Sequence, residues 1–285
     1  MKHVSSVMSG LGLLVGAAIT CGLLATTPGF AAGRTVADIK AAGELRIGDE
    51  ASYVPFAFRQ QDGKIVGYDI DVTNEFCKDL QVKCTVVDTV WAGIIPALLA
   101  DKFDIIMGQL DYSPERMAKV GFSIPYTSAS QAMLIRAADR EKIKSLDDLS
   151  GKVLGVKLGS PGAQNKDAIN KQIAADTGKG LADIKTFDDH PAAYLALLDG
   201  RVDGVLNSLT TLAVLLKDQP GKFAIVPKIG ADNWAGVATH LGDTDLIGFL
   251  DKELLRMKAD GTLAKLQQKW FGITMDLPDT APSFK

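Results

Sequence analysis

Short apolar runs alternate with longer stretches in which apolar residues recur at helical spacing along most of this chain. In the first half, the pattern predicts strands at 45–47, 85–87 and 105–107, with helices at 69–80 and 91–100 between them. A second series of runs lies at 131–135, 153–156, 192–199, 204–206, 209–215 and 223–226, before a long helix expected at 245–270. This alternation is typical of βαβ units and predicts an α/β fold with parallel strands.

The N-terminal stretch has the pattern of a secretory signal peptide at 1–31. Lys2 precedes an almost uncharged segment whose apolar core runs over 11–24, and Gly29 and Ala31 supply small residues for cleavage before Ala32. The apolar core is too short to span a membrane, and no charged stop follows it. Lipidation at Cys21 is the alternative, but the residues before Cys21 do not fit a lipoprotein signal. A periplasmic location follows from the secretory interpretation.

The charge of the expected mature chain excludes several kinds of partner. After removal of the signal, 30 basic and 34 acidic residues leave a net charge of −4, without basic clusters. Such a sequence gives no sign of the positively charged patch that binds nucleic acid or an anionic lipid surface.

Four phrases between Leu45 and Arg116 mark places where the chain meets a small molecule. In order, they read LRIGDEASYVPF, GKIVGYDIDV, VWAGIIPALLADKFDIIMG and YSPER. The first is a strand that ends at a polar turn and then presents Tyr53, which is where open α/β sheets bind ligands. From about Gly43 to Gly272 the chain resembles the extracytoplasmic solute-binding proteins of family 3, the polar amino acid receptors of ABC importers, in particular the histidine and lysine/arginine/ornithine type.

The resemblance implies a two-lobed periplasmic-binding-protein fold of type II, with a two-strand hinge and the ligand between the lobes. Lobe 1 is expected at 32–131 and 232–285, and lobe 2 at 132–231. The implied function is capture of an amino acid or amine-bearing solute and its delivery to a membrane permease, by a monomer that needs no cofactor. A ligand that touches both lobes shifts the population toward the closed form.

Two cysteines remain after the signal. Cys77 and Cys84 fall at the end of one expected helix and the start of the next strand, where the turn can bring them within disulfide range in an oxidising compartment. The same spacing occurs in histidine-type receptors, where the bridge is structural. A metal or redox role is the alternative, but no third ligand is near and the spacing is not that of a redox pair.

Three residues of the first lobe match positions that contact the ligand in the resembling family. Tyr53 matches the aromatic that packs over the ligand, and Trp91 matches a pocket-facing apolar group; for both, the alternative is a place in the core. Arg116 matches the arginine that grips the ligand carboxylate, a task that suits its planar fork. The alternative for Arg116 is a solvated position on a helix.

Other candidate site residues depart from the family pattern. Asp111 replaces a hydroxyl residue, and Ser208 lies where an aspartate holds the ligand ammonium. The loop at Ser160 also departs from the family pattern. Asn207 or Gln109 can replace the ligand contacts that these departures remove. The alternative for Gln109 is that it only narrows the site. Glu50 matches an acid that meets the side chain of basic ligands. If Glu50 and Asp111 are ionised, they outnumber Arg116, and a basic or amine-bearing solute is expected.

Two rival functions remain open. Periplasmic cyclohexadienyl dehydratases use the same scaffold, and Asp111 or Glu50 with a raised pKa suits such catalysis. A receptor that signals to, or escorts, another protein is the second rival. The sequence has no catalytic motif for nucleotide binding or serine hydrolysis and no histidines at metal-ligand spacing, so we expect neither an enzyme nor a metal site.

Overall fold

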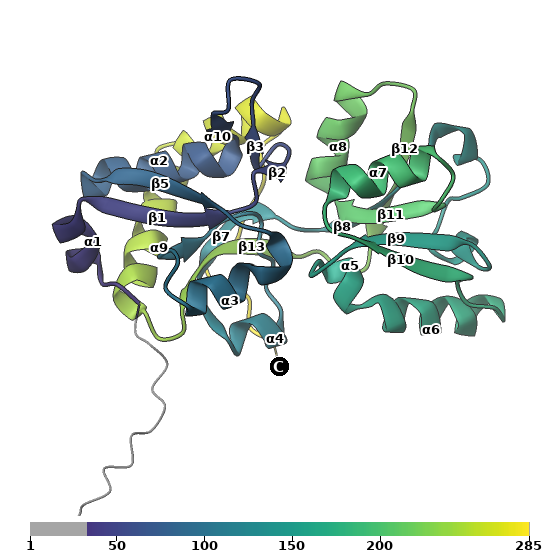
Figure 1. The fold of residues 1–285 in the computed structure, drawn as a ribbon, viewed down its shortest axis with the longest axis horizontal. Helices are drawn as coiled ribbons and strands as arrows, with labels where there is room; N and C mark the ends of the chain where they lie inside the picture. Colours follow the sequence, from purple (N-terminus) through teal and green to yellow (C-terminus); the bar gives the residue numbers. More distant parts are fainter. Residues whose placement is uncertain (1–32, 285) are drawn as a thin grey trace, which may run out of the picture.

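The computed structural model describes residues 33–284, and the predicted signal peptide lies outside the described residues. The chain forms two lobes, each a five-stranded sheet flanked by helices (Figure 1). The predicted two-lobed α/β fold is confirmed.

Lobe 1 is built on a mixed sheet in which β1 lies between the parallel strands β5 and β6, while β13 runs antiparallel to β6 and β7. A small sheet of β2, β3 and β4 lies beside it. The strands are β1 (Glu44–Asp49), β2 (Ser52–Tyr53), β3 (Ala57–Arg59), β4 (Ile65–Val66), β5 (Lys83–Asp88), β6 (Ile105–Ile106), β7 (Val120–Ser128) and β13 (Trp234–His240). The helices are α1 (Val36–Ala42), α2 (Tyr68–Leu80), the 3₁₀ turn η1 (Trp91–Gly93), α3 (Ile94–Leu99), α4 (Pro114–Met117), α9 (Thr244–Ala259) and α10 (Thr262–Phe271).

Lobe 2 repeats this plan with strands in the order β10, β9, β11, β8 and β12, of which the first three are parallel. The strands are β8 (Gln131–Arg136), β9 (Val153–Lys157), β10 (Asp183–Phe187), β11 (Gly204–Ser208) and β12 (Phe223–Ile229). The helices are η2 (Ala137–Asp139), η3 (Asp147–Leu149), α5 (Pro161–Gln164), α6 (Lys166–Thr177), α7 (His190–Leu198) and α8 (Leu209–Asp218).

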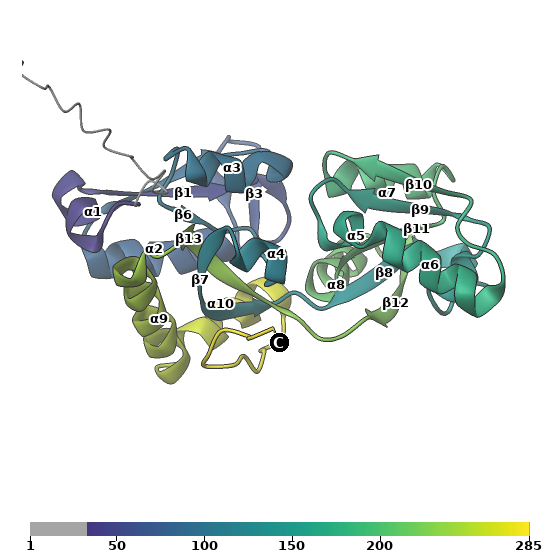
Figure 2. The same ribbon diagram turned by 90° about the horizontal axis from the view of Figure 1, so that it is seen from below.

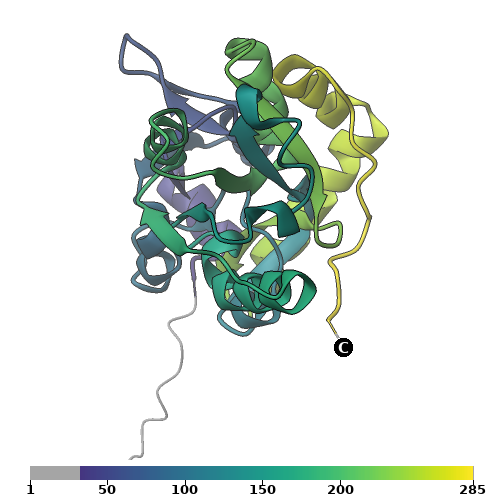
Figure 3. The same cartoon turned by 90° about the vertical axis from the view of Figure 1, so that its right-hand side faces the viewer.

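The chain crosses between the lobes twice, from β7 to β8 and from β12 to β13 (Figure 2). The two crossings are joined, because the Ala129 amide donates to the Asn233 carbonyl at 2.8 Å and the Ser130 hydroxyl lies 3.3 Å from an Asp232 oxygen. In the view along the long axis, lobe 2 covers lobe 1, and the C-terminal segment runs down one side (Figure 3).

The single long helix predicted at 245–270 is wrong. The structure has α9 and α10 instead, separated at Asp260 and Gly261. Gly261 adopts a φ of 77°, a left-handed conformation that glycine accepts easily and that ends a helix. Both helices pack on lobe 1, where Leu250, Leu254 and Leu263 join its apolar core.

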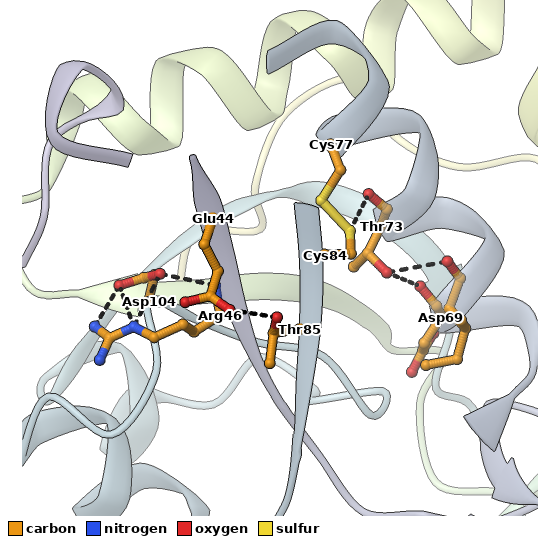
Figure 4. The surroundings of a disulfide bond; sticks show 9 residues. Glu44, Arg46, Asp69, Thr73, Cys77, Cys84, Thr85 and Asp104 are labelled. Carbon is orange, nitrogen blue, oxygen red and sulfur yellow. Dashed lines mark hydrogen bonds and ion pairs between the residues drawn. A yellow bond between two sulfur atoms is a disulfide. The ribbon is translucent and has the colours of Figure 1, made fainter. Parts of the chain in front are cut away.

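The predicted Cys77–Cys84 disulfide is confirmed, with the two Cα atoms 5.8 Å apart. It joins the end of α2 to the start of β5 (Figure 4). Figure 4 also shows Asp104 beside β1, where its carboxylate pairs with Arg46 at 2.6 Å. The disulfide therefore holds α2 to β5, and the ion pair holds β1 to the residue that precedes β6.

Candidate functional site

The carboxyl ends of the parallel strands in both lobes point toward the space between the lobes, which is where α/β sheets place their ligand sites. Glu50 follows β1, and Gln109 follows β6 by a short turn. In lobe 2, Lys157 ends β9, and Asn207 and Ser208 end β11. The strand order therefore brings polar side chains from distant parts of the sequence to one place.

All nine predicted ligand-binding residues are buried in this region. Six of them line one small cavity of about 30 Å³, namely Tyr53, Trp91, Gln109, Asp111, Ser160 and Asn207. The other three contact that lining: Glu50 through Lys157, Arg116 through Asp111, and Ser208 through Tyr53. A cavity of this size holds about two water molecules. An amino acid therefore requires the lobes, or a side chain between them, to move.

Tyr53 is the main polar link between the lobes. Its hydroxyl lies 2.7 Å from the Gln109 amide oxygen in lobe 1 and 2.9 Å from the Asn207 amide oxygen in lobe 2. The Thr211 hydroxyl donates to the same atom at 3.1 Å. Because a phenol carries one proton, only one of the two amide oxygens receives it at a time, and the other is available to a donor on a solute. Gln109 has a φ of 59°, a conformation rare outside glycine and common at ligand sites.

Arg116 lies on α4 with its guanidinium buried between Asp111 and lobe 2. One terminal nitrogen pairs with the Asp111 carboxylate, and the other donates to the Gly159 carbonyl at 3.0 Å. The Trp91 indole donates to that same carbonyl at 3.2 Å. Gly159 has a φ of 74°, and a Cβ at this position would lie 3.3 Å from Trp91, so glycine suits the contact. The Nε of Arg116 has no hydrogen-bond partner among the described residues.

Burial raises the pKa of Asp111 above its usual range, and the Arg116 charge opposes this. One predicted match, Arg116, and one predicted departure, Asp111, therefore form one unit: an acid in the cavity wall with a base beside it. A zwitterion carries the complementary pair of charges, with a carboxylate for Arg116 and an ammonium for Asp111.

Lys157 was missed by the sequence analysis, although it directly precedes the loop of Ser160. Its ammonium crosses to lobe 1, pairs with Glu50, and lies 5.2 Å from the ring centre of Tyr53 and 5.1 Å from that of Trp91. Burial lowers the pKa of Lys157, and the Glu50 charge opposes this. Its position at the end of a predicted strand, facing the other lobe, was the available signal.

Lys157 changes the charge balance on which the expected preference for a basic solute rested. Glu50 and Asp111 do not outnumber the bases, because each acid has its own partner, Lys157 and Arg116 respectively. The premise of that expectation was therefore incomplete. The charge of the solute itself remains a prediction.

His190, also missed, is the first residue of α7 and stacks between two tyrosines. Its ring centre is 5.4 Å from that of Tyr53 and 5.8 Å from that of Tyr194. Neither ring nitrogen has a hydrogen-bond partner among the described residues; the Leu206 backbone is close but does not meet the geometry of a bond. Burial, with the Lys157 charge second, lowers the pKa of His190 well below its usual range, so the ring is neutral. The sequence analysis considered the histidines only as metal ligands and therefore did not identify His190 as a residue of the site.

Two buried acids lie beneath the lobe 1 part of the site. Asp69 accepts a hydrogen bond from the Gly108 amide at 2.7 Å, and Asp49 accepts one from the Glu50 amide at 2.7 Å. Burial raises the pKa of Asp69 to about 7, and burial with the nearby Asp69 charge raises that of Asp49. These carboxyls fix the turns that carry Glu50 and Gln109.

Within residues 33–284, no group of three or more histidine, cysteine or acidic side chains is arranged to hold a metal ion. None of the helices in the same range has the length and apolar character of a membrane span.

Known proteins resemble this chain over most of its length. The family model for bacterial extracellular solute-binding proteins, family 3, matches residues 45–273. The L-cystine-binding protein TcyJ of Escherichia coli (strain K12) is 31% identical over 234 residues, which cover 82% of this chain and 85% of that protein.

Two solved structures extend the comparison. An ancestral arginine-binding protein bound to glutamine has a TM-score of 0.72 and 37% identity, covering 81% of this chain and 98% of that one. The ancestral amino acid-binding protein AncCDT-1, a precursor of cyclohexadienyl dehydratase, has a TM-score of 0.74 and 33% identity, covering 84% and 100%. With the matched family model and the two-lobed site, this chain belongs to the bacterial extracellular solute-binding proteins of family 3.

Proposed function

We propose that this protein captures a neutral, zwitterionic amino acid between its lobes, outside the cytoplasm, and delivers it to the permease of an ABC importer. The observation that carries the proposal is the ion pair between Asp111, in the cavity wall, and Arg116 behind it. Arg116 has an Nε with no partner among the described residues, and Asp111 lines the cavity itself. The α-carboxylate of the solute then pairs with Arg116, and its α-ammonium pairs with Asp111.

The ammonium site is thereby moved from lobe 2 to lobe 1. Ser208, which matches the usual aspartate position, caps α8 by accepting from the Thr211 amide at 3.3 Å and contacts the Tyr53 hydroxyl at 3.4 Å. It supplies no charge. Asp111 supplies that charge instead, and Asn207 or Gln109 offers the amide oxygen that Tyr53 leaves free.

A basic amino acid is a second candidate solute. Glu50, with the rings of Tyr53 and Trp91, forms a place that suits a cation, because an ammonium already lies there. The similarity to an arginine-binding protein supports this candidate. A basic side chain must displace Lys157 into solvent or share Glu50 with it, and like charges at this distance disfavour sharing.

Binding without chemistry is part of the proposal. Similarity to a precursor of cyclohexadienyl dehydratase and the raised pKa of Asp111 are the observations that favour an enzyme. Asp111 is ion-paired with Arg116, however, and the Arg116 charge opposes the rise in the pKa of Asp111, which disfavours the protonated carboxyl that a proton donor needs. Incubation with the dehydratase's substrate, followed by ultraviolet absorbance of an aromatic product, tests this rival; aromatisation at an enzymatic rate would overturn the binding-only proposal.

The direct test is a thermal-shift screen of purified residues 32–285, unfolded and refolded to remove bound solute. A ligand at 100 times its dissociation constant stabilises by about 2.7 kcal/mol, or roughly 5–10 °C for a chain of this size. The proposal expects shifts with neutral amino acids and weaker shifts with arginine, lysine and polyamines. Shifts confined to basic compounds would overturn it in favour of the second candidate.

A further inference from the structure

A second, larger pocket lies on the far side of Tyr53 and His190 from the small cavity. Its volume is about 360 Å³, within the range of small-molecule sites, and its lining is mostly apolar. Ser52, Tyr53 and Val54 of lobe 1 form one wall. Residues of α7 and α8, with Gln219 and Phe223, form the lobe 2 wall, and α7 and α8 face β2 and β3 in Figure 1. Tyr53 and His190 line both this outer pocket and the inner cavity.

Several large apolar side chains are exposed here. Val54, Leu195 and Leu198 line the outer pocket, with 42%, 56% and 40% of their surface exposed respectively. A group of this kind, drawn from both lobes, is unusual on a protein surface unless it meets an apolar partner. The exposure favours a binding role over a place in either core.

Lys157 closes the other route that a solute side chain would take. Its ammonium occupies the space beside the rings of Tyr53 and Trp91 and is paired with Glu50. A solute whose head group is held by Arg116 and Asp111 must therefore direct its side chain elsewhere. Two open volumes of sufficient size share a wall with the inner cavity: the outer pocket, through Tyr53 and His190, and a pocket of about 370 Å³ beside Arg116, through Trp91. The outer pocket is the more apolar of the two, and it is the one whose shared wall includes His190.

His190 is the part of the shared wall that is able to move. Tyr53 is held by polar contacts to Gln109, Asn207 and Thr211, whereas neither nitrogen of His190 has a hydrogen-bond partner among the described residues. Rotation of His190 therefore breaks no hydrogen bond. A buried, unsatisfied imidazole also gains from a ligand that supplies a donor or acceptor.

We propose that the two cavities form one elongated site: the charged head of the solute lies in the inner cavity, and an elongated, uncharged side chain passes His190 into the outer pocket. The inference rests on the proposed function and specifies the solute class, neutral amino acids with long, mainly apolar side chains. Tyr53 and His190 are the side chains that the solute passes.

The test is a calorimetric titration of the refolded protein with alanine, norvaline, norleucine and 2-aminooctanoic acid. Affinity is expected to rise about fourfold for each added methylene, which is about 0.8 kcal/mol. Leu195→Trp, which fills the outer pocket from an exposed helix position, is expected to flatten this rise. Leu255→Trp, on α9 and 41% exposed, is the matched control and is expected to keep the full rise.

The two proposals fail in different ways. If alanine binds through Arg116 but affinity is independent of chain length, the elongated site is wrong and the proposed function stands. If Leu195→Trp retains the full rise, the outer pocket does not receive the side chain. If no neutral amino acid binds at all, the proposed function fails.

A second readout is the imidazole resonance of His190, assigned with His190→Gln, which is expected to shift with norleucine and to stay in place with alanine.

Discussion

The two lobes hold their binding side chains in different ways. In lobe 1, the main groups are fixed within the lobe: Arg116 pairs with Asp111, and the Gln109 amide donates to the Ser128 carbonyl at 2.6 Å. In lobe 2, the ammonium of Lys157 has its ion pair across the cleft with Glu50, and His190 has no hydrogen-bond partner in the described part of the chain. Separation of the lobes keeps the pair of Arg116 with Asp111 but breaks the bond of Arg116 to Gly159, and it removes the partner of Lys157 altogether.

This difference assigns different tasks to the lobes. Lobe 1 is pre-organised for the head group of a solute, whereas lobe 2 has the side chains whose surroundings change on closure. Selectivity for the solute side chain is therefore expected from lobe 2, since its residues have alternatives in the open form.

The largest effect is expected from removing the charge of Arg116, which tests whether lobe 1 holds the head group of the solute. Arg116→Gln is expected to weaken binding of neutral amino acids at least 100-fold, because it removes the carboxylate partner and leaves Asp111 buried without a counter-charge. Calorimetric titration measures the change, and Arg140→Gln, at a side chain 71% exposed in lobe 2, is the control. A loss below fivefold would show that the head group is not held in lobe 1.

The second prediction concerns the buried acid beneath the lobe 1 edge. The pKa of Asp69 is raised to about 7 in the folded protein, so its protonated form favours folding. Its contribution to stability is complete below about pH 4 and is lost as the pH rises through 7. The free energy of unfolding of the wild type should fall with pH by up to about 1.4 kcal/mol per pH unit more than that of Asp69→Asn.

Urea unfolding of both proteins between pH 4.5 and 7.5 makes this comparison. Taking the difference between the two removes the contributions of titrating groups that do not interact with Asp69; Asp49, whose pKa the Asp69 charge helps to raise, is not among them. Parallel pH profiles for wild type and variant would mean that Asp69 is not the titrating group.

Lys157→Met tests whether lobe 2 sets the selectivity for the solute side chain. Methionine keeps the contacts with the two aromatic rings and removes the cation that is paired with Glu50. The ratio of arginine affinity to norvaline affinity is expected to rise at least tenfold, since Glu50 then accepts the ligand's cation. Competition titrations give the ratio, with Lys152→Met as a control for loss of a lysine in the same lobe. An unchanged ratio would contradict the selectivity role.

The smallest predicted effect comes from the contact between Trp91 and the Gly159 carbonyl. Trp91→Phe removes the indole donor and keeps an aromatic ring beside Lys157. A single hydrogen bond contributes about 0.5–1.5 kcal/mol, so affinity is expected to fall about three- to tenfold. Dissociation rates from stopped-flow fluorescence of the remaining tryptophans should rise by the same factor. An unaltered dissociation rate would show that the hydrogen bond between Trp91 and Gly159 does not stabilise the closed form.

The sequence predicted β1, β5, β6 and α2 of lobe 1 because their signals are local, but it gave no strand for β2, β3, β4 or β7. Short apolar runs predict β1, β5 and β6, whereas Tyr53 and Arg116 were selected because the phrases around them resemble those of family 3. The break at Gly261 was missed because the apolar pattern continues across it, although the glycine itself was the available signal. The disulfide was predicted because both cysteines lie at one turn.

The lobe 2 part of the site was harder to predict. Lys157 and His190 are recognisable only from their neighbours across the cleft, Glu50 and Tyr53, more than one hundred residues away in sequence. The sequence analysis identified Asp111 and Ser208 as departures from the family pattern, but what they do together depends on where the charges pair. Pairing between lobes is a property of the tertiary structure and has no pattern in the sequence.

The most direct test of the account is a calorimetric comparison of the best neutral amino acid with its carboxamide and its N-acetyl derivative. If Arg116 and Asp111 hold the two ends of a zwitterion, each derivative should bind at least 100-fold more weakly than the parent, and Asp111→Asn should abolish the discrimination against the N-acetyl form alone. Equal binding of the parent and both derivatives would contradict the claim that this charged pair recognises the solute.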